Sequence, residues 1–407
     1  MLPMLELIVL IVAITGLVAS TVYLALVIIA AVRFRASANQ ECHTAKGNTA
    51  LPPVTVLKPL HGMEPLLKDC LESFFRQDYP VYELIFGARS GSDPALAVVE
   101  SLRMKYPHIA TRTVLSGNPG YPNAKVHLME RMLPLATYPI LFITDSDVRV
   151  APDYLAHVVK PMLDLTVGMV TCLYRGVSTG GFWALLEALG MSIEMSSGVL
   201  VANLLEGMKF ALGPTMVIRK DVLARWGGFG VLRDFCADDF VMGALTYEAG
   251  SKVVLSHHVI DHIVLNRSGL ASFLHQLRWM KSSRFSRRMG HIGTGLTFAM
   301  PFGVLALAAG WMSGNSALGL GLFFAAFANR VIQALVVGWG VTHDRDSALY
   351  CWVYPLRDLL GFILWCASFS GSEVVWRGER YRLVSGGRMV PKDRSEAASP
   401  KDGIRPG

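Results

Sequence analysis

The sequence lacks the cysteine pairs that hold zinc or staple a small secreted fold. Its six cysteines are scattered over 407 residues without a C-x-x-C pair, which argues against a zinc site and a disulfide scaffold and favours a reducing compartment. Glycine-rich nucleotide loops are also missing, because no G-x-G-x-x-G follows the first predicted strand and no G-x-x-x-x-G-K-[ST] occurs. Ordinary dinucleotide folds and P-loop ATPases are therefore disfavoured. A diphosphate site that relies on a metal remains open.

Charged residues are scarce as well. They make up 17% of the chain against 52% hydrophobic residues, which is too apolar for an ordinary soluble enzyme. The formal charge is +7, but no basic run is interleaved with aromatic residues as nucleic-acid platforms require. Lys and Arg instead flank apolar spans, as the positive-inside rule describes. The composition indicates a membrane protein with no nucleic-acid partner.

The N-terminus carries the first apolar span. Leu7–Val32 contains no charged residue and exceeds the ~20 residues needed to cross a bilayer. Arg33 and Arg35 follow, so this end should face the cytoplasm and the N-terminus the outside. A secretory signal peptide is the alternative, but it would be shorter and preceded by basic residues. Residues 1–35 are predicted to be a transmembrane anchor, with a polar linker over 36–50.

From residue 51 to 288 the pattern changes to that of an α/β domain. Short apolar runs alternate with amphipathic segments, which predicts a parallel sheet with helices on both faces. The expected strands are Val54–Leu57, Tyr82–Gly87, Arg112–Leu115, Ile140–Ile143, Phe210–Arg219 and Lys252–Leu255; the expected helices include Pro65–Phe75, Ala95–Lys105, Ala124–Met132 and Lys220–Trp226. The apolar stretch Gly181–Leu205 fits either a buried helix or one on the membrane surface.

Two aspartates follow the strand Ile140–Ile143. A buried strand that ends in Asp145-Ser146-Asp147 places both carboxylates at the carboxyl edge of the sheet, where α/β folds bind ligands. Acids at i and i+2 can share one hard cation with a diphosphate. The alternative is that the pair only caps a turn.

A second acid pair and a basic segment lie further on. Asp238-Asp239 is expected at the start of a helix, where two carboxylates also suit the helix dipole without any further role. The basic segment Ser272–Arg288 carries His275-Gln276-Leu277-Arg278-Trp279 and leads directly into apolar sequence.

The C-terminal part, 289–376, reads as a membrane block. Its apolar segments are Ile292–Met312, Ala317–Val341 and Ser347–Ser370, interrupted only by Arg330 and by Arg357-Asp358. Neighbours in one helix do not face each other, so Arg357 and Asp358 are expected to have partners elsewhere or to lie near the interface. A basic tail, 377–407, follows. Three crossings here would leave that tail outside, against the positive-inside rule, so one segment, by preference that containing Pro301, is expected to be re-entrant or interfacial.

The motifs together resemble a known family. From about Val54 to Val390 they are VLKPLHG, FGARSGSDPA, NAKV, DSDVRVAPDYL, GPTMVIRKDVL, CADDF, HQLRW and YPLRDLLGF with VVWRGERYRL. Their order resembles the family 2-like glycosyltransferases of GT-A fold, and more closely the ceramide glucosyltransferase family, glycosyltransferase family 21. The bacterial hopanoid-pathway glycosyltransferases share the layout.

The resemblance implies a reaction and its residues. A nucleotide sugar, usually UDP-linked, would donate its sugar with inversion to a lipid hydroxyl. Asp145 and Asp147 match the acids that bind Mg²⁺ or Mn²⁺, and Asp239 matches the general base. Arg278 and Trp279 match a pair that would close over the diphosphate or acceptor.

Further residues are implied as donor contacts. Lys58 and Lys125 are expected to assist nucleotide binding, although Lys58 also fits a solvated strand end and Lys125 a charge at a helix start. Ser90 stands where the family commonly has an acid that contacts the uridine, and Asp93 is a substitute for it. His275 replaces the expected Gln or Arg, and it fits a packing role better than a site role.

Several alternatives remain at this point. A processive polysaccharide synthase has similar acids but needs more helices for its channel, and an inactive membrane scaffold is disfavoured by the retained acids. The acceptor is either ceramide or a hopanoid polyol, and the sugar glucose or N-acetylglucosamine. The implied location is a multi-pass membrane protein with its catalytic domain on the cytoplasmic side of a bacterial inner membrane.

Overall fold

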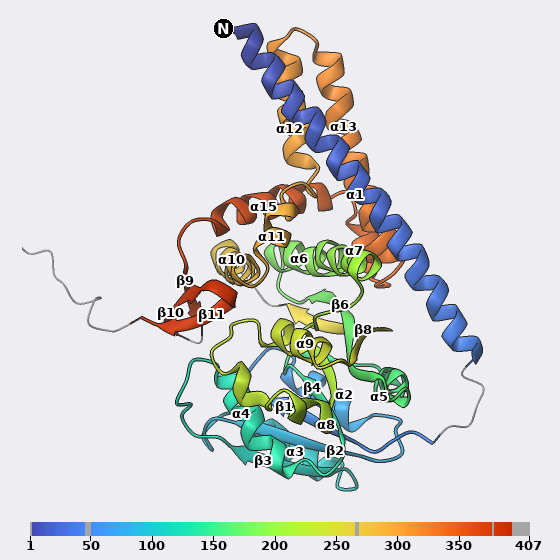
Figure 1. Cartoon of the computed structure of the whole chain (residues 1–407), viewed down its shortest axis with the longest axis vertical. Coiled ribbons are helices and arrows are strands. Elements are labelled where there is room, and N and C mark those ends of the chain that lie inside the picture. Colours follow the sequence, from blue (N-terminus) through green and yellow to red (C-terminus); the bar gives the residue numbers. More distant parts are fainter. Residues whose placement is uncertain (1, 45–49, 265–267, 377, 393–407) are drawn as a thin grey trace, which may run out of the picture.

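The computed structural model describes residues 2–44, 50–264, 268–376 and 378–392. It consists of a helical stalk that stands on an α/β body, with a layer of crosswise helices between the two (Figure 1). The stalk contains the first part of α1 (Leu2–Thr44), together with α12 (Met300–Met312) and α13 (Ser316–Gln333), and α12 packs against both α1 and α13. The rest of α1 runs past the crosswise helices to β8 (Lys252–Val264) of the body, where the hydroxyl of Ser37 lies 3.0 Å from the Nε2 atom of His257. The N-terminus and the α12–α13 turn lie together at the far end of this stalk.

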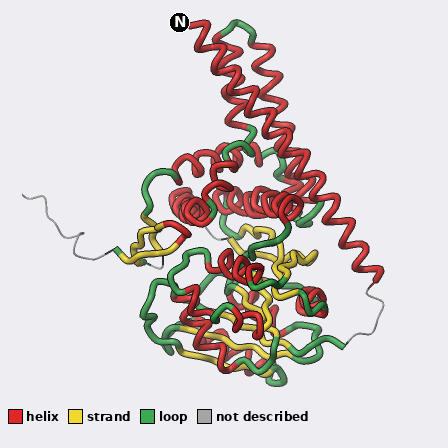
Figure 2. Tube along the Cα trace, viewed as in Figure 1, coloured by secondary structure: helices red, strands yellow, loops and turns green. Residues whose placement is uncertain are grey.

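The body is built on an eight-stranded sheet, seen as the yellow layer in Figure 2. Its strand order is β3-β2-β1-β4-β7-β6-β8-β5. The strands are β1 (Val54–Pro59), β2 (Tyr82–Ala88), β3 (Ala110–Leu115), β4 (Ile140–Thr144), β5 (Val148–Arg149), β6 (Val167–Ser178), β7 (Thr215–Arg219) and β8 (Lys252–Val264). The helices of this domain are α2 (Leu67–Phe75), α3 (Ala95–Lys105), α4 (Ala124–Met132), α5 (Tyr154–Val159), α8 (Lys220–Arg225) and α9 (Asp238–Glu248).

The sheet is mixed, but the predicted parallel pairing holds in its first half and again between β6 and β8. Strands β3, β2, β1 and β4 are parallel, but β7 runs antiparallel to both β4 and β6. β6 was not predicted, and β8 extends well beyond Leu255. These two strands pair with each other over most of their length, and this pairing depends on contacts between distant segments that local periodicity does not report.

The order in which the chain forms the strands identifies the edge of the sheet at which a ligand would bind. The chain runs outward from β1 to β2 and β3, then returns to place β4 on the other side of β1. Ligands of α/β folds bind at the carboxyl ends of strands where the winding direction changes. Leu57 of β1 lies level with Ile143 of β4, so the residues that follow these two strands share one edge.

A crosswise layer separates the body from the stalk. It contains α6 (Phe182–Leu189), a π-helical segment (Gly190–Met195), α7 (Ser196–Glu206), α10 (Gly269–Ser286), α11 (Arg288–Thr294) and α15 (Tyr354–Ser368) (Figure 1). The segment Phe182–Glu206 is apolar enough to cross a membrane but is largely buried within the protein. Of the two readings of Gly181–Leu205, the structure therefore fits the buried helix.

The stalk holds the other helices of membrane-spanning character. Met4–Ala38 and Ser316–Trp339 are long and apolar enough to cross a bilayer, and α12 is apolar but shorter. The segment containing Pro301 was expected to be re-entrant or interfacial, yet α12 stands upright in a hairpin with α13. The C-terminal segment that lies crosswise is α15. With α12 and α13 paired, the basic C-terminal residues lie on the same side of the stalk as the α/β body.

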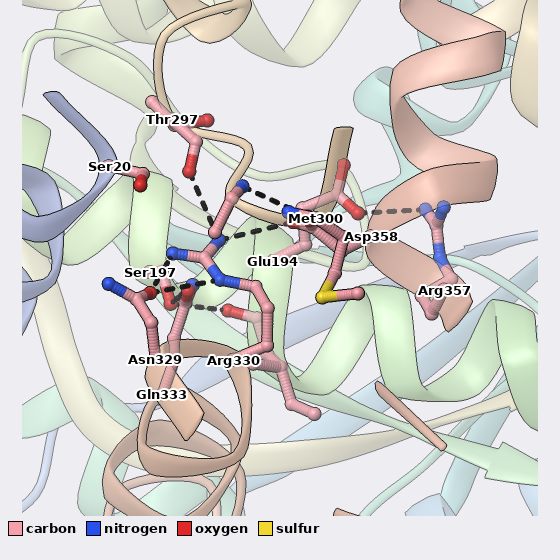
Figure 3. A network of polar contacts seen from close by, with 12 residues as sticks. Ser20, Glu194, Ser197, Thr297, Met300, Asn329, Arg330, Gln333, Arg357 and Asp358 are labelled. Atoms are coloured by element: carbon pink, nitrogen blue, oxygen red, sulfur yellow. Dashed lines mark hydrogen bonds and ion pairs between the residues drawn. The ribbon is translucent and has the colours of Figure 1, made fainter. Parts of the chain in front are cut away.

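Buried ion pairs tie the stalk to the crosswise layer (Figure 3). Arg330 of α13 lies 3.1 Å from Asp358 of α15, and Arg357 lies 3.0 Å from Glu194 of the π-helical segment. The other oxygen of Asp358 accepts hydrogen bonds from the backbone N–H groups of Ala299 and Met300 at the start of α12. The prediction that Arg357 and Asp358 have separate partners is confirmed.

The C-terminal residues form a small antiparallel sheet of β9 (Glu373–Trp376), β10 (Glu379–Val384) and β11 (Arg388–Pro391). The stretch predicted as a basic tail, 377–407, therefore contains β10 and β11 within its described residues. The sheet packs around Val374, Tyr381, Leu383 and Met389, which are buried together with Cys236 of the α/β body. Basic charge alone did not distinguish this sheet from an extended tail.

Candidate functional site

Lys58 and Asp145 meet at the ends of β1 and β4. The Lys58 side chain is fully buried, lies 3.9 Å from the centre of the Phe74 ring, and donates a hydrogen bond to the backbone carbonyl of Asp145. Burial lowers the pKa of Lys58 to about 8, against the opposing effect of neighbouring acids. Lys58 is thus not a solvated strand end. It fixes the backbone from which Asp145 projects.

The carboxylates of Asp145 and Asp147 are about one-third exposed. Asp145 pairs with Lys125 at 2.7 Å, and Asp147 lies 3.5 Å from the Nε2 atom of His262 on β8. Within the described part of the chain, the buried Oδ1 atom of Asp147 has no hydrogen-bond partner. Two carboxylates with an unused oxygen form a donor set that suits a hard divalent cation.

Glu64 is a third acid at this edge and was not predicted from the sequence. It follows β1 in the loop that begins after Pro59. Burial first, and then the charge of Asp147, raise the pKa of Glu64 to about 7. Its Oε2 atom is buried and, among the residues described, has no hydrogen-bond partner. Its position after a strand of the ligand-binding edge was the available signal.

Lys125 links the two acid pairs. It lies in the first turn of α4, which is capped by the Asn123 side chain accepting a hydrogen bond from Val126. Its ammonium is 2.7 Å from Asp145 and 3.9 Å from Asp238. Burial alone would lower the pKa of Lys125, but the negative charges of Asp145 and Asp238 have the larger combined effect and raise it. Lys125 is therefore a paired, charged residue inside the site.

Asp238 and Asp239 begin α9, as predicted. One oxygen of Asp239 accepts a hydrogen bond from the N–H of Phe240, as the helix-end alternative expects. The other faces Gly213, where an added Cβ would lie 3.1 Å from Asp239 and 3.7 Å from the Oδ2 atom of Asp145. Burial and then the charge of Asp238 raise the pKa of Asp239 to about 6. Asp239 and Asp145 thus converge on one point.

Arg278 and Trp279 of α10 have different surroundings. The guanidinium of Arg278 lies beside the thiol of Cys236, and burial lowers the pKa of Arg278. Charges on Asp238 and Asp239 also act on that thiol. Trp279 packs against the main core and against His275, with ring centres 4.3 Å apart.

His275 and the loop after β2 have structural contacts. The Nδ1 atom of His275 lies 2.8 Å from the buried carboxylate of Glu187, which fits the packing role expected for it. Asp93 accepts hydrogen bonds from Gly62 through both oxygens, at 3.1 Å each, and one from Ala95 at 3.0 Å. The hydroxyl of Ser90 lies 2.9 Å from that of Ser92. Asp93 therefore braces the loop after β1.

A cavity of about 580 Å³ opens beside this acid cluster. That volume lies within the ~300–1,000 Å³ range of small-molecule sites. The loops after β1, β2 and β3 line one side, and the C-terminal sheet lines the other. Its lining includes His61, Arg89, Pro119, Gly120, Tyr121, Pro122, Ala124, Arg233, Asp234, Trp376, Glu379 and Tyr381. None of these residues was predicted to belong to the site, because they come together only in the fold.

Comparisons with known proteins give the family. The model of glycosyl transferase family 21 matches residues 9–389. Ceramide glucosyltransferase 1 of Caenorhabditis elegans is 25% identical over 359 residues, which cover 87% of this chain and 76% of that protein. The ceramide glucosyltransferase of Komagataella phaffii is 39% identical over 114 residues, or 27% of this chain and 22% of that protein.

Among solved structures, a mannosyltransferase of Pyrobaculum calidifontis in complex with GDP-Man and Mn²⁺ is similar, with a TM-score of 0.47 and 19% identity, covering 86% of this chain and 98% of that one. The family match extends over nearly the whole sequence and includes both the stalk and the α/β body. The chain thus belongs to glycosyl transferase family 21, and it is a hexosyltransferase with the apolar helices of a membrane protein.

Proposed function

We propose that the protein transfers a hexose from a UDP-sugar to the hydroxyl of a membrane lipid, with inversion at the anomeric carbon. The observation that carries this proposal is the convergence of Asp145 and Asp239 on the small space beside Gly213. Asp145 belongs to the acid pair that suits a cation bound to a diphosphate, and Asp239 can accept a proton. An inverting transfer needs both groups around one reacting centre.

The donor side would be formed by the end of β4 and its neighbours. Asp145 and Asp147 would hold Mg²⁺ or Mn²⁺, with Glu64 close by, and the unpartnered oxygen of Asp147 supports this assignment. A bound divalent cation supplies positive charge that stabilises the departing diphosphate. Lys125 keeps Asp145 oriented through its ion pair, and Lys58 holds the backbone at the same residue. In this proposal Ser90 is a minor contact to the nucleotide, and Asp93 acts by bracing the adjacent loop.

The acceptor side would be formed by α9 and α10. Asp239 takes the proton from the lipid hydroxyl as its oxygen bonds to the anomeric carbon and the bond to the diphosphate breaks. The raised pKa suits this role, because a base is most effective when its pKa approaches the working pH. Arg278, which lies beside Cys236 just before α9, would offset negative charge on the diphosphate. Trp279 would hold α10 in position through its packing.

A lipid acceptor fits the position of this site beneath the crosswise helices and the stalk (Figure 1). The ceramide glucosyltransferases among the relatives favour ceramide and UDP-glucose; a hopanoid polyol with UDP-N-acetylglucosamine is the alternative for the same site.

Arg33 and Arg35 at the body end of α1 favour a catalytic domain on the cytoplasmic side of the membrane, and we assign the protein to a bacterial inner membrane. The catalytic unit would comprise residues 51–288 together with the C-terminal sheet.

A direct assay tests the proposed reaction. Detergent-solubilised protein is incubated with Mg²⁺ or Mn²⁺, a panel of UDP-sugars, and ceramide or hopanoid-polyol acceptors, and the lipid products are weighed by mass spectrometry. A hexose on ceramide is the expected product. An N-acetylhexosamine on the hopanoid would retain the mechanism and change the substrates. Folded protein that binds UDP but forms no product with any pair would contradict the proposal.

Replacement of the proposed base gives the first prediction. Asp239→Asn is expected to lower the rate of transfer by on the order of 10²–10⁴-fold, the usual contribution of a general base, while UDP binding is largely retained. The matched control is Asp221→Asn on α8, which removes an exposed acid paired with Arg225 and should leave turnover unchanged. Near-normal turnover in Asp239→Asn would remove this residue from the role of base.

A further inference from the structure

The C-terminal sheet forms one wall of the cavity beside the acid cluster. Trp376 at the end of β9, together with Glu379 and Tyr381 of β10, lines this side. The opposite side comes from His61 after β1 and Arg89 after β2. The cavity therefore joins the ligand-binding edge of the large sheet to the last folded segment of the chain.

This wall is fixed to the segment that leads into α9. The N–H of Met389 donates to the carbonyl of Asp234 at 2.6 Å, and the N–H of Cys236 donates to that of Gly387 at 3.0 Å. Between these bonds, Arg388 pairs with Phe235 as a β-bridge. The contacts extend the small sheet onto the residues immediately before Asp238 and Asp239. The wall thus has a set position relative to the acids.

The lining has the chemistry of a nucleoside site. Trp376 and Tyr381 are aromatic, and the Tyr381 hydroxyl donates to Glu379 at 2.6 Å, which leaves a carboxylate at the cavity surface. Arg89 is close enough for its charge to act on Tyr381 and is held by Asn118 at 2.8 Å. Aromatic rings stack on nucleobases, and a carboxylate accepts hydrogen bonds from ribose hydroxyls.

The adjoining residues set the orientation of such a ligand. Ala124 lines the cavity, and the next residue, Lys125, contacts Asp145. A nucleotide whose base lies at the C-terminal sheet can therefore extend its diphosphate past the start of α4 toward Asp145 and Asp147. The C-terminal sheet that lines the cavity lies to one side of the stalk (Figure 1), which favours a water-soluble ligand over a lipid.

We propose that this cavity binds the nucleoside half of the sugar donor, with Trp376 stacking on the base and Glu379 accepting from the ribose. The C-terminal sheet is then a part of the donor site. The proposal rests on the proposed function, because it assumes a nucleotide-sugar donor.

The test compares UDP with pyrophosphate as ligands of the full-length protein, by calorimetry in the presence of Mn²⁺. Trp376→Ala should raise the Kd for UDP by about tenfold, in line with the stacking lost per base, and leave the Kd for pyrophosphate unchanged. Trp376→Phe should restore most of the affinity for UDP. Trp311→Ala is the matched control, since Trp311 is exposed on α12, and it should bind UDP as the wild type does.

Glu379→Gln is the second variant. The Glu379 side chain is exposed, so this substitution should not disturb the packing of the sheet. It should weaken UDP binding several-fold and spare pyrophosphate. Unchanged UDP affinity in both Trp376→Ala and Glu379→Gln, with a wild type that binds UDP, would overturn the inference and leave the proposed function intact. Equal losses for UDP and pyrophosphate would also overturn it. A wild type that binds no nucleotide would overturn both proposals.

Discussion

Lys125 is the residue on which the charge balance of the site depends. Its ammonium contacts one acid of each pair, Asp145 and Asp238, with only 12% of its side chain exposed. Two acid pairs this close would otherwise repel one another, and burial together with the neighbouring acids raises the pKa values of Asp238 and Asp239. A single lysine at the start of α4 therefore allows four carboxylates to share one end of the sheet.

The raised pKa of Asp239 leads to a prediction about pH. A general base works as the carboxylate, so kcat/KM should be at its full value well above the pKa of about 6 and should fall as the pH drops through it. An Asp with the ordinary value of 3.8 would stay active to much lower pH. The measurement is a profile of kcat/KM from pH 4.5 to 8.

The control for this profile is Asp238→Asn. Because the charge of Asp238 contributes to the raised pKa of Asp239, its removal should shift the midpoint to lower pH. A wild-type midpoint near 4 would show that Asp239 is not held in this environment during the reaction.

Among the secondary-structure elements, the sequence predicted best where the signal is local. α4 begins and ends as predicted because Asn123 caps it and its apolar positions recur with helical spacing. Asp145 and Asp147 were placed correctly after β4 because a buried strand ends there. The sequence did not reveal β6, the antiparallel course of β7, or the contact of Asp93 with Gly62, since each depends on residues distant in the chain. The cavity lining was missed for the same reason.

The link between stalk and crosswise layer gives a prediction about stability. Asp358→Asn removes the partner of Arg330 and weakens two hydrogen bonds to the start of α12. Loss of one member of a buried ion pair typically costs about 3–5 kcal/mol, so the variant should unfold at clearly lower temperature in detergent. Arg330→Met and the double variant complete a double-mutant cycle, in which strongly non-additive losses are expected.

Glu206→Gln serves as the control for this cycle, because its pair with Arg287 is largely exposed. Exposed pairs contribute only about 0–1 kcal/mol, so its melting temperature should stay near that of the wild type. A small effect of Asp358→Asn, equal to that of Glu206→Gln, would show that the network does not hold the helices together.

At the scale of the whole molecule, two basic regions lie at the same end of the stalk: the end of α1 that carries Arg33 and Arg35, and the C-terminal sheet. With α1, α12 and α13 as the crossing helices, the α/β body and the C-terminal sheet share a side, and the α12–α13 turn shares the other with the N-terminus (Figure 1). This arrangement satisfies the positive-inside rule without a fourth crossing.

Labelling with a membrane-impermeant maleimide tests this topology in spheroplasts. Ser313→Cys in the α12–α13 turn should be labelled in intact spheroplasts, and Ser92→Cys in the α/β body only after permeabilisation; both positions are exposed. Exposed Cys366 is replaced by Ser in both. Equal labelling of the two positions before permeabilisation would contradict the arrangement.

The strand contact between Gly387–Met389 and Asp234–Cys236 has a consequence for biosynthesis. The residues before α9 emerge from the ribosome long before their partner strand, which is made only after the whole stalk. A nascent chain would hold the proposed catalytic acids while lacking one wall of the cavity. If the C-terminal sheet belongs to the donor site, full donor affinity would be reached only once the last helices have been inserted. The synthesis of active enzyme would then be coupled to the completion of its membrane anchor.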